Sequence, residues 1–165
     1  MSELARGPLD ELADRWRAGW ARGGFDACCT PDVSYEDPTA PQLLRGVDAL
    51  ERHALGLRTA FPDLQIEATA PPLGRGDHIC MPWRALGTHR EDLGAMLPAT
   101  DRFVTLHGVH YVELTDGAVR RARGFFDLYD AAIQLGLLPE RGGLGETALL
   151  LLRGFGLRRR PEPGR

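Results

Sequence analysis

Residues 102–126, with the sequence RFVTLHGVHYVELTDGAVRRARGFF, contain the pattern that decides the fold class of this chain. Two runs rich in β-branched and aromatic residues, 102–114 and 118–126, flank the turn Thr115-Asp116-Gly117. An Asp-Gly pair between two such runs is a strong signal for a β-hairpin. The second half of the chain is therefore expected to carry two long antiparallel strands.

The segments before this hairpin predict helices first and strands second. A helix is expected between Pro8 and Gly23-Gly24, and a second one over residues 47–60, because apolar residues recur there at steps of three and four. After a short strand at 33–36, two-residue alternation predicts strands at 64–69 and 78–88. This segregated order indicates the α+β class. The stripe of the first helix consists of Leu9, Leu12, Trp16 and Trp20.

The composition limits the function classes. With 165 residues, 43% of them hydrophobic, the chain is expected to form one domain over residues 1–157, with a disordered Arg/Pro-rich tail at 158–165. A net charge of −3 argues against nucleic acid as a partner. All 20 basic residues are arginines, so a lysine Schiff base, a pyridoxal cofactor and a P-loop are excluded.

The three cysteines, Cys28, Cys29 and Cys80, fit neither a disulfide framework nor a zinc spacing. The first residues lack the pattern of a signal peptide, and the longest apolar run, 148–152, is too short for a membrane helix. We therefore expect a cytoplasmic protein that needs no membrane. A helix is expected from 128 to 134 and another from 146 to about 157. The second of these is expected to cover a pocket mouth or join a dimer partner, and contact of its Arg cluster with an anionic membrane surface is the alternative.

Five segments, taken in their order and spacing, resemble the SnoaL-like branch of the nuclear transport factor 2-like, or ketosteroid-isomerase-like, superfamily. The resemblance implies a cone-shaped fold, in which a curved antiparallel sheet wraps helices around an apolar pocket. It also implies a homodimer. The segments are the Trp16/Trp20 helix, Tyr35-Glu36-Asp37-Pro38, residues 45–64, Gly87-Thr88-His89, and residues 109–136 with Asp116-Gly117, Asp127 and Gln134-Leu135-Gly136.

In the polyketide cyclases of this superfamily the acid/base is an aspartate at the end of the last strand, and the matching residue here is Asp127. If the strand has no bulge, alternation places Arg123, Phe125 and Asp127 on one face with Val119. A carboxyl group in apolar surroundings has a raised pKa and moves protons near neutral pH. The alternative is that Asp127 caps the helix that follows it.

Histidines are the other catalytic candidates. His110 alternates with Val112 and Leu114 on an apolar strand face, whereas His107 lies on the opposite face. A neutral core histidine is the alternative for His110, and a strand-end role is the alternative for His89. Arg123 either binds a substrate oxygen or pairs with Glu113. The expected substrate-binding residues are Arg123, Phe125, Tyr35, Asp37, His53 and Trp83.

The leading hypothesis is a polyketide-cyclase-like enzyme without cofactor or metal. Asp127 would move a proton beside a carbonyl of a hydrophobic small molecule, while His110 or His89 stabilises the enolate oxygen. An epoxide or ester hydrolase is the second hypothesis, and it requires Asp37, Arg123 and Asp127 to meet in the pocket. The third hypothesis is a small-molecule-binding protein without a reaction, because fold does not imply function.

Overall fold

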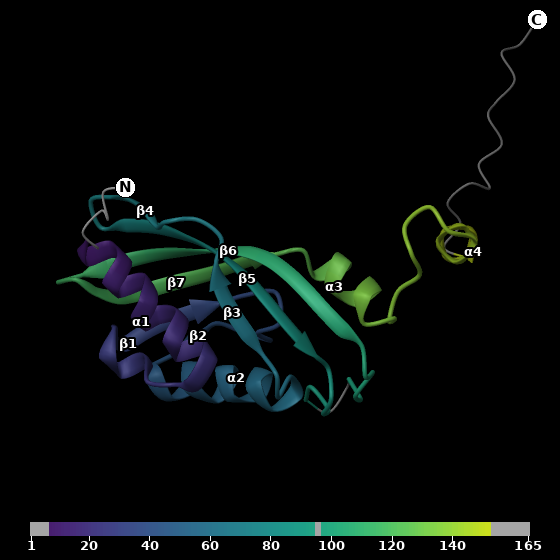
Figure 1. The fold of residues 1–165 in the computed structure, drawn as a ribbon, viewed down its shortest axis with the longest axis horizontal. Helices are drawn as coiled ribbons and strands as arrows, with labels where there is room; N and C mark the ends of the chain where they lie inside the picture. Colours follow the sequence, from purple (N-terminus) through teal and green to yellow (C-terminus); the bar gives the residue numbers. More distant parts are fainter. Residues whose placement is uncertain (1–6, 95–96, 153–165) are drawn as a thin grey trace, which may run out of the picture.

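The structure is a computed structural model that describes residues 7–94 and 97–152. A strongly curved sheet of seven strands holds helices against its concave face (Figure 1). The strand order is β2-β1-β7-β6-β5-β3, and β4 pairs with β5. The elements are α1 (Pro8–Arg22), η1 (Phe25–Ala27), β1 (Cys29–Glu36), β2 (Leu44–Arg45), α2 (Val47–Ala60), β3 (Gln65–Ala68), β4 (Leu73–Arg75), β5 (His78–Thr88), β6 (Phe103–Thr115), β7 (Ala118–Phe126), α3 (Leu128–Gln134) and α4 (Leu144–Leu152).

The predicted α+β class and the curved sheet around a core are confirmed. Helix α1 begins at Pro8, and Asp10 accepts a hydrogen bond from the Gly7 backbone at 2.9 Å. It ends where Gly23 and Gly24 take φ angles of 88° and 94°. The predicted stripe faces the sheet, because Trp16 and Trp20 are both buried.

The β6–β7 hairpin forms as predicted. Thr115 pairs with Ala118, and the two residues between them, Asp116 and Gly117, have φ angles of 51° and 78°. Positive φ at both central positions is the type I′ geometry, which matches the twist of the strands. The expectation of a wholly antiparallel sheet needs one correction, because β1 pairs with β7 in the parallel direction.

A bulge in β7 changes which of its residues face the core. Glu113 pairs with Arg121, but the next residue, Leu114, pairs with Val119, so Arg120 is an extra residue in the ladder. Beyond the bulge, Ala122 and Gly124 are buried and Arg123 and Phe125 are exposed. The prediction that Arg123 and Phe125 share the inner face with Val119 is therefore wrong.

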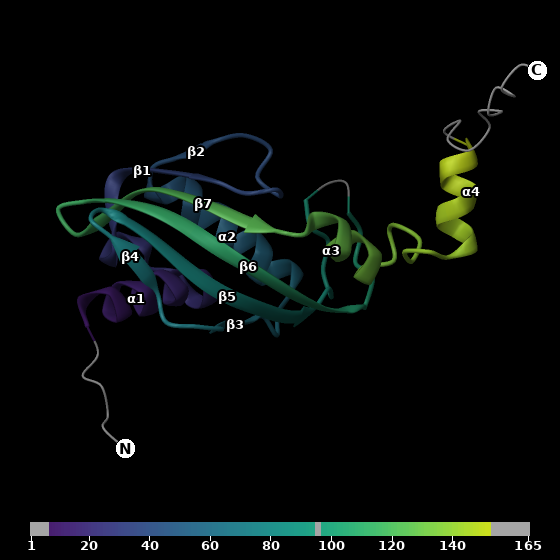
Figure 2. The same cartoon turned by 90° about the horizontal axis from the view of Figure 1, so that it is seen from above.

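Helix α4 lies away from the sheet in both views (Figures 1 and 2), and the Tyr129 hydroxyl of α3 donates a hydrogen bond to its Glu146 at 3.2 Å. It begins two residues earlier than predicted, and its exposed side chains include Leu144 and Leu152. The expected helix end near residue 157 and the expected tail at 158–165 lie outside the described residues. In the described part of the chain, no helix has both the length and the apolar character needed to cross a bilayer.

Candidate functional site

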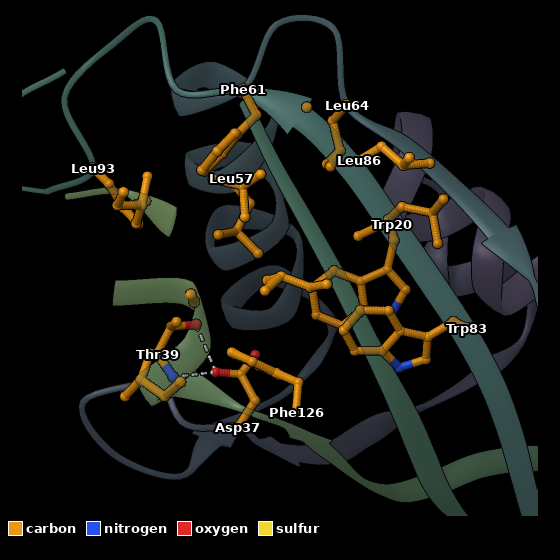
Figure 3. A pocket seen from close by; sticks show the side chains of 18 of the residues that line it. Trp20, Asp37, Thr39, Leu57, Phe61, Leu64, Trp83, Leu86, Leu93 and Phe126 are labelled. Carbon is orange, nitrogen blue, oxygen red and sulfur yellow. Dashed lines mark hydrogen bonds between the residues drawn. The ribbon is translucent and has the colours of Figure 1, made fainter. Parts of the chain in front are cut away.

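An apolar pocket of about 200 Å³ lies between the concave face of the sheet and helices α2 and α3 (Figure 3). Strands β3, β5 and β6 supply one wall, and the loop before β6 closes one side. Almost all of its surface is carbon, which suits an apolar ligand. Its apolar lining includes Leu57, Phe61, Leu64, Ile66, Ala85, Leu86, Leu93, Leu97, Val104, Leu106, Phe126, Ala131 and Leu135.

Polar side chains meet at the β1 end of this pocket. Tyr35 alternates with Val33 on β1, so both point inward and are buried. Asp37 follows the last residue of the strand, and Pro38 prevents the strand from continuing. One oxygen of Asp37, Oδ1, accepts hydrogen bonds from the backbone N–H of Thr39 at 2.7 Å and from its hydroxyl at 2.7 Å (Figure 3). The same oxygen accepts the Ala40 N–H at 2.8 Å.

The second oxygen of Asp37 joins two more side chains. Oδ2 accepts the Tyr35 hydroxyl at 2.9 Å and lies 3.0 Å from Nε2 of His53 on α2. Only 4% of the Asp37 side chain is exposed. Burial alone would raise the pKa of this carboxyl, but the hydrogen bonds from His53, Thr39 and Tyr35 outweigh it and hold the pKa below its usual range. Asp37 is therefore a carboxylate at neutral pH.

His110 lies beside this carboxylate, stacked between two indole rings. Its ring centroid is 5.4 Å from Trp20 and 5.3 Å from Trp83, with interplanar angles of 7° and 29°. Burial lowers the pKa of His110 to about 3, although the charge of Asp37 acts in the opposite direction. The imidazole is therefore neutral near pH 7.

The hydrogen bonds determine which nitrogen of His110 carries the proton. Burial, and next the charge of Asp37, raise the pKa of Tyr35, so the phenol keeps its single proton and donates it to Asp37. The Tyr35 oxygen can then only accept from His110 Nε2, which lies 3.4 Å away. Nδ1 is left with a lone pair, and within the described ranges no protein group hydrogen-bonds to it.

Asp127 does not occupy the predicted apolar surroundings. Its side chain is 56% exposed, caps α3 by accepting the Asp130 N–H at 2.9 Å, and lies 2.9 Å from Arg141. The Asp130 N–H and then Arg141 lower the pKa of the Asp127 carboxyl, whereas the apolar site had predicted a raised pKa. Asp127 is absent from the described lining of the pocket. This placement corrects the expectation, and it fits the alternative of a helix cap.

Arg123 and Phe125 lie on the outer face of the sheet. The Arg123 guanidinium stands 5.0 Å over the Phe125 ring and 3.7 Å from Glu36, not beside Glu113. Asp37, Arg123 and Asp127 each pair with a different residue, so the constellation required for the hydrolase hypothesis does not form.

His89 is buried, and its hydrogen bond is to the loop before β6 and not to the pocket. Its Nδ1 accepts the Thr100 backbone N–H at 3.2 Å, and its ring lies 5.1 Å from Phe61. It is not among the described residues that line the pocket.

Four of the predicted site residues do line the pocket: Tyr35, Asp37, Trp83 and His110. His53, on α2, contacts Asp37 and is not among the described residues that line the pocket. Trp20 and Thr39 also line the pocket, and the sequence analysis did not name them as site residues. Trp20 was visible as the last member of the helical stripe, and Thr39 could have been found from the Asp-Pro-Thr order, which favours a turn with hydrogen bonds to the aspartate.

The sequence profile of SnoaL-like polyketide cyclases matches residues 10–135. The chain belongs to the SnoaL-like polyketide cyclase family. No curated protein sequence gives a significant match.

Solved structures agree with the family in fold. A candidate SnoaL-like polyketide cyclase from Jannaschia sp. CCS1 is 20% identical, with a TM-score of 0.68 over 81% of this chain and 98% of its own. TsrD from Streptomyces laurentii is 22% identical, with a TM-score of 0.69 over 82% and 100%. A protein of ketosteroid-isomerase-like fold from Catenulispora acidiphila is 12% identical, with a TM-score of 0.63 over 76% and 92%. At these identities the likeness concerns the fold.

Proposed function

We propose that this SnoaL-like protein catalyses the cofactor-independent ring closure of a hydrophobic carbonyl compound, with His110 as the acid/base in contact with the substrate. The observation that carries the proposal is a neutral imidazole that lines the polar end of an otherwise apolar pocket and whose Nδ1 accepts no hydrogen bond from the described residues. A base must reach the proton that it removes, and His110 lines the pocket whereas Asp127 does not.

The reaction balances without any further reactant. His110 Nδ1 takes a proton from the carbon beside one carbonyl, and the enolate carbon then bonds to a second carbonyl carbon of the same molecule. The alkoxide that results receives the proton back from His110. Asp37 and Tyr35 are positioning residues, because they hold the imidazole through Nε2 and place a negative charge near the imidazolium that forms.

The weak basicity of His110 limits the substrate. Because burial lowers the pKa of His110 to about 3, an ordinary ketone would be too weak an acid to transfer its proton to this group. A carbon flanked by two carbonyl groups is far more acidic. We therefore infer a 1,3-dicarbonyl compound of polyketide type, whose flat apolar part fills the pocket beside Trp83 and Phe61.

The test compares His110→Gln, Asp37→Asn and Asp127→Asn with the wild type on a panel of polyketide-like β-keto esters and diketones. We expect His110→Gln to lower turnover by about 10²- to 10⁴-fold, the usual contribution of a general acid/base. Asp127→Asn is the matched control and should leave turnover unchanged. Loss of turnover in Asp127→Asn with full activity in His110→Gln would contradict the proposal and return the role to Asp127.

Binding and turnover are separated by a second measurement. Aromatic lactones, steroids and β-diketones are screened by thermal shift, and the compounds that bind are then analysed for product. Ligands that bind in the wild type and are returned unchanged would show a binding protein without a reaction. In that case Trp83→Ala should still abolish the thermal shift, because Trp83 forms part of the pocket wall.

A further inference from the structure

Two adjacent thiols, Cys28 and Cys29, lie outside the pocket and take no part in the proposed reaction. Cys28 follows η1, and Cys29 is the first residue of β1. Their Sγ atoms are 3.9 Å apart and both residues are buried, with exposed fractions of 4% and 8%. Neighbouring side chains on an extended strand point to opposite faces, but the irregular backbone at Cys28, with φ −139° and ψ −4°, brings these two sulfurs together.

Cys29 is the member of the pair that borders an opening to the surface. Cys29 lines an open surface cavity of about 540 Å³ at the start of α2, together with Gly46, Val47, Arg45 and Arg52. The two thiols also differ in acidity. The hydrogen bond between them lowers the pKa of Cys28 and raises the pKa of Cys29. Cys28 is therefore the more acidic thiol of the pair, and the thiolate is the form that reacts.

The separation of the sulfurs suits a single bridging atom. With bonds to sulfur of about 2.3 Å, and an angle between a right angle and the tetrahedral value, one atom holds two sulfurs about 3.3 to 3.8 Å apart. The observed 3.9 Å is close to this range, so a small side-chain rotation is enough.

The two sulfurs of Cys28 and Cys29 limit which atom can bridge them. A structural zinc ion needs four protein ligands, and in residues 7–94 and 97–152 no group of three or more His, Cys, Asp or Glu side chains is arranged to hold a metal ion. Trivalent arsenic that bears one organic group has two exchangeable positions and needs only two sulfurs. We propose that Cys28 and Cys29 form a dithiol site that captures organoarsenous acids, with the organic group lying in the cavity beside Arg45 and Arg52.

The capture is a condensation that leaves the arsenic trivalent. Each As–OH bond is replaced by an As–S bond, and each hydroxyl leaves with one thiol proton as water. One RAs(OH)₂ and two thiols therefore give one RAs(S)₂ bridge and two waters, and no electron is transferred.

The experiment uses phenylarsine oxide, which hydrates to phenylarsonous acid, and intact-mass spectrometry of the folded full-length chain. Excess 2-mercaptoethanol is present, because a monothiol removes arsenic held by one cysteine but competes poorly with a chelate. We expect one phenylarsenic group per chain in the wild type and a raised Tm, since a ligand that binds the folded state stabilises it. The matched control, Cys80→Ser, should retain the adduct because Cys80 lies on β5.

Cys28→Ser and Cys29→Ser should each lose the adduct, and 2,3-dimercaptopropanol should remove it from the wild type. Circular dichroism shows whether each variant is folded. If a serine variant fails to fold, proteolytic mapping of the wild-type adduct replaces it and should locate arsenic on the peptide that contains both cysteines. Capture only after unfolding in urea, or retention of the adduct by folded Cys29→Ser, would overturn the proposal.

Discussion

The buried imidazole of His110 should make the protein sensitive to mild acid. The folded state lowers the pKa of His110 to about 3, whereas an unfolded histidine titrates near 6.5. Above about pH 6.5 both states are neutral and the group contributes nothing to the pH dependence. Below that pH the unfolded chain binds a proton that the folded chain does not, so stability falls until the pH reaches about 3.

The size of the loss follows from the two pKa values. Each pH unit within this window costs about 1.4 kcal/mol, so lowering the pH from 7 to 4.5 should remove about 2.5 kcal/mol of the free energy of unfolding through His110. For a chain of this length that corresponds to a fall in Tm of roughly 5 to 10 °C. Carboxylates also begin to take up protons near pH 4.5, so the contribution of His110 is the difference between the wild type and His110→Gln over the same interval.

The assay is urea unfolding at pH 7 and at pH 4.5 for the wild type, His110→Gln and His107→Gln. Glutamine does not titrate but keeps an amide N–H that can donate to Tyr35, so His110→Gln should lose about 2.5 kcal/mol less than the wild type over this interval. His107 lies exposed on the other face of the same strand, so His107→Gln should behave like the wild type. Equal losses in the wild type and His110→Gln would refute the reasoning.

Four further outcomes are expected. Asp37→Asn should lower the free energy of unfolding by about 3 kcal/mol at pH 7, because the charged hydrogen bonds of a buried carboxylate are lost. Folding lowers the pKa of Asp37, so urea unfolding should show this difference between wild type and variant above about pH 4. The difference should disappear as the pH falls further. Gly124→Ala would place a Cβ 2.6 Å from the Tyr35 hydroxyl oxygen and should lower Tm by several degrees, whereas Gly56→Ala on the open face of α2 should raise it. Asp127→Ala removes the α3 cap and should cost about 1 kcal/mol in urea unfolding, without changing thermal shifts by pocket ligands. The homodimer implied by the resemblance should appear in light scattering as twice the chain mass of 18.1 kDa.

Several elements could be predicted closely because their signals are local. Helix α2 (Val47–Ala60) and strands β5 (His78–Thr88) and β7 (Ala118–Phe126) have the predicted bounds. Each of these elements ends where the spacing of apolar residues changes and where a glycine, a proline or an Asp-Gly turn occurs. These residues restrict the backbone next to them, so the ends of the element can be found from the local sequence. The placement of His110 inside and His107 outside was also predicted, because β6 keeps its alternation between these two residues.

The errors concern contacts between distant segments. The extra residue at Arg120 is invisible in the sequence, since Arg120 and Arg121 are both polar and the bulge exists only against β6. It moves Arg123 and Phe125 to the outer face of the sheet. The parallel pairing of β1 with β7 likewise depends on residues about ninety positions apart, as in the pair Cys29 and Val119.

By itself, the sequence determined the helices, the strands and the hairpin, because propensities and turn residues act on the backbone next to them. It also determined the absence of lysine chemistry, because composition does not depend on the fold. Only the tertiary structure decided which aspartate faces the pocket. Asp37 and Asp127 both follow a strand end, and their local sequences do not show which of them is buried. The packing of α2 against β1 buries Asp37 against His53 and Tyr35, whereas Asp127 is left in solvent beside Arg141. The environment of a carboxyl group, and with it its pKa, is set by neighbours that come from elsewhere in the chain.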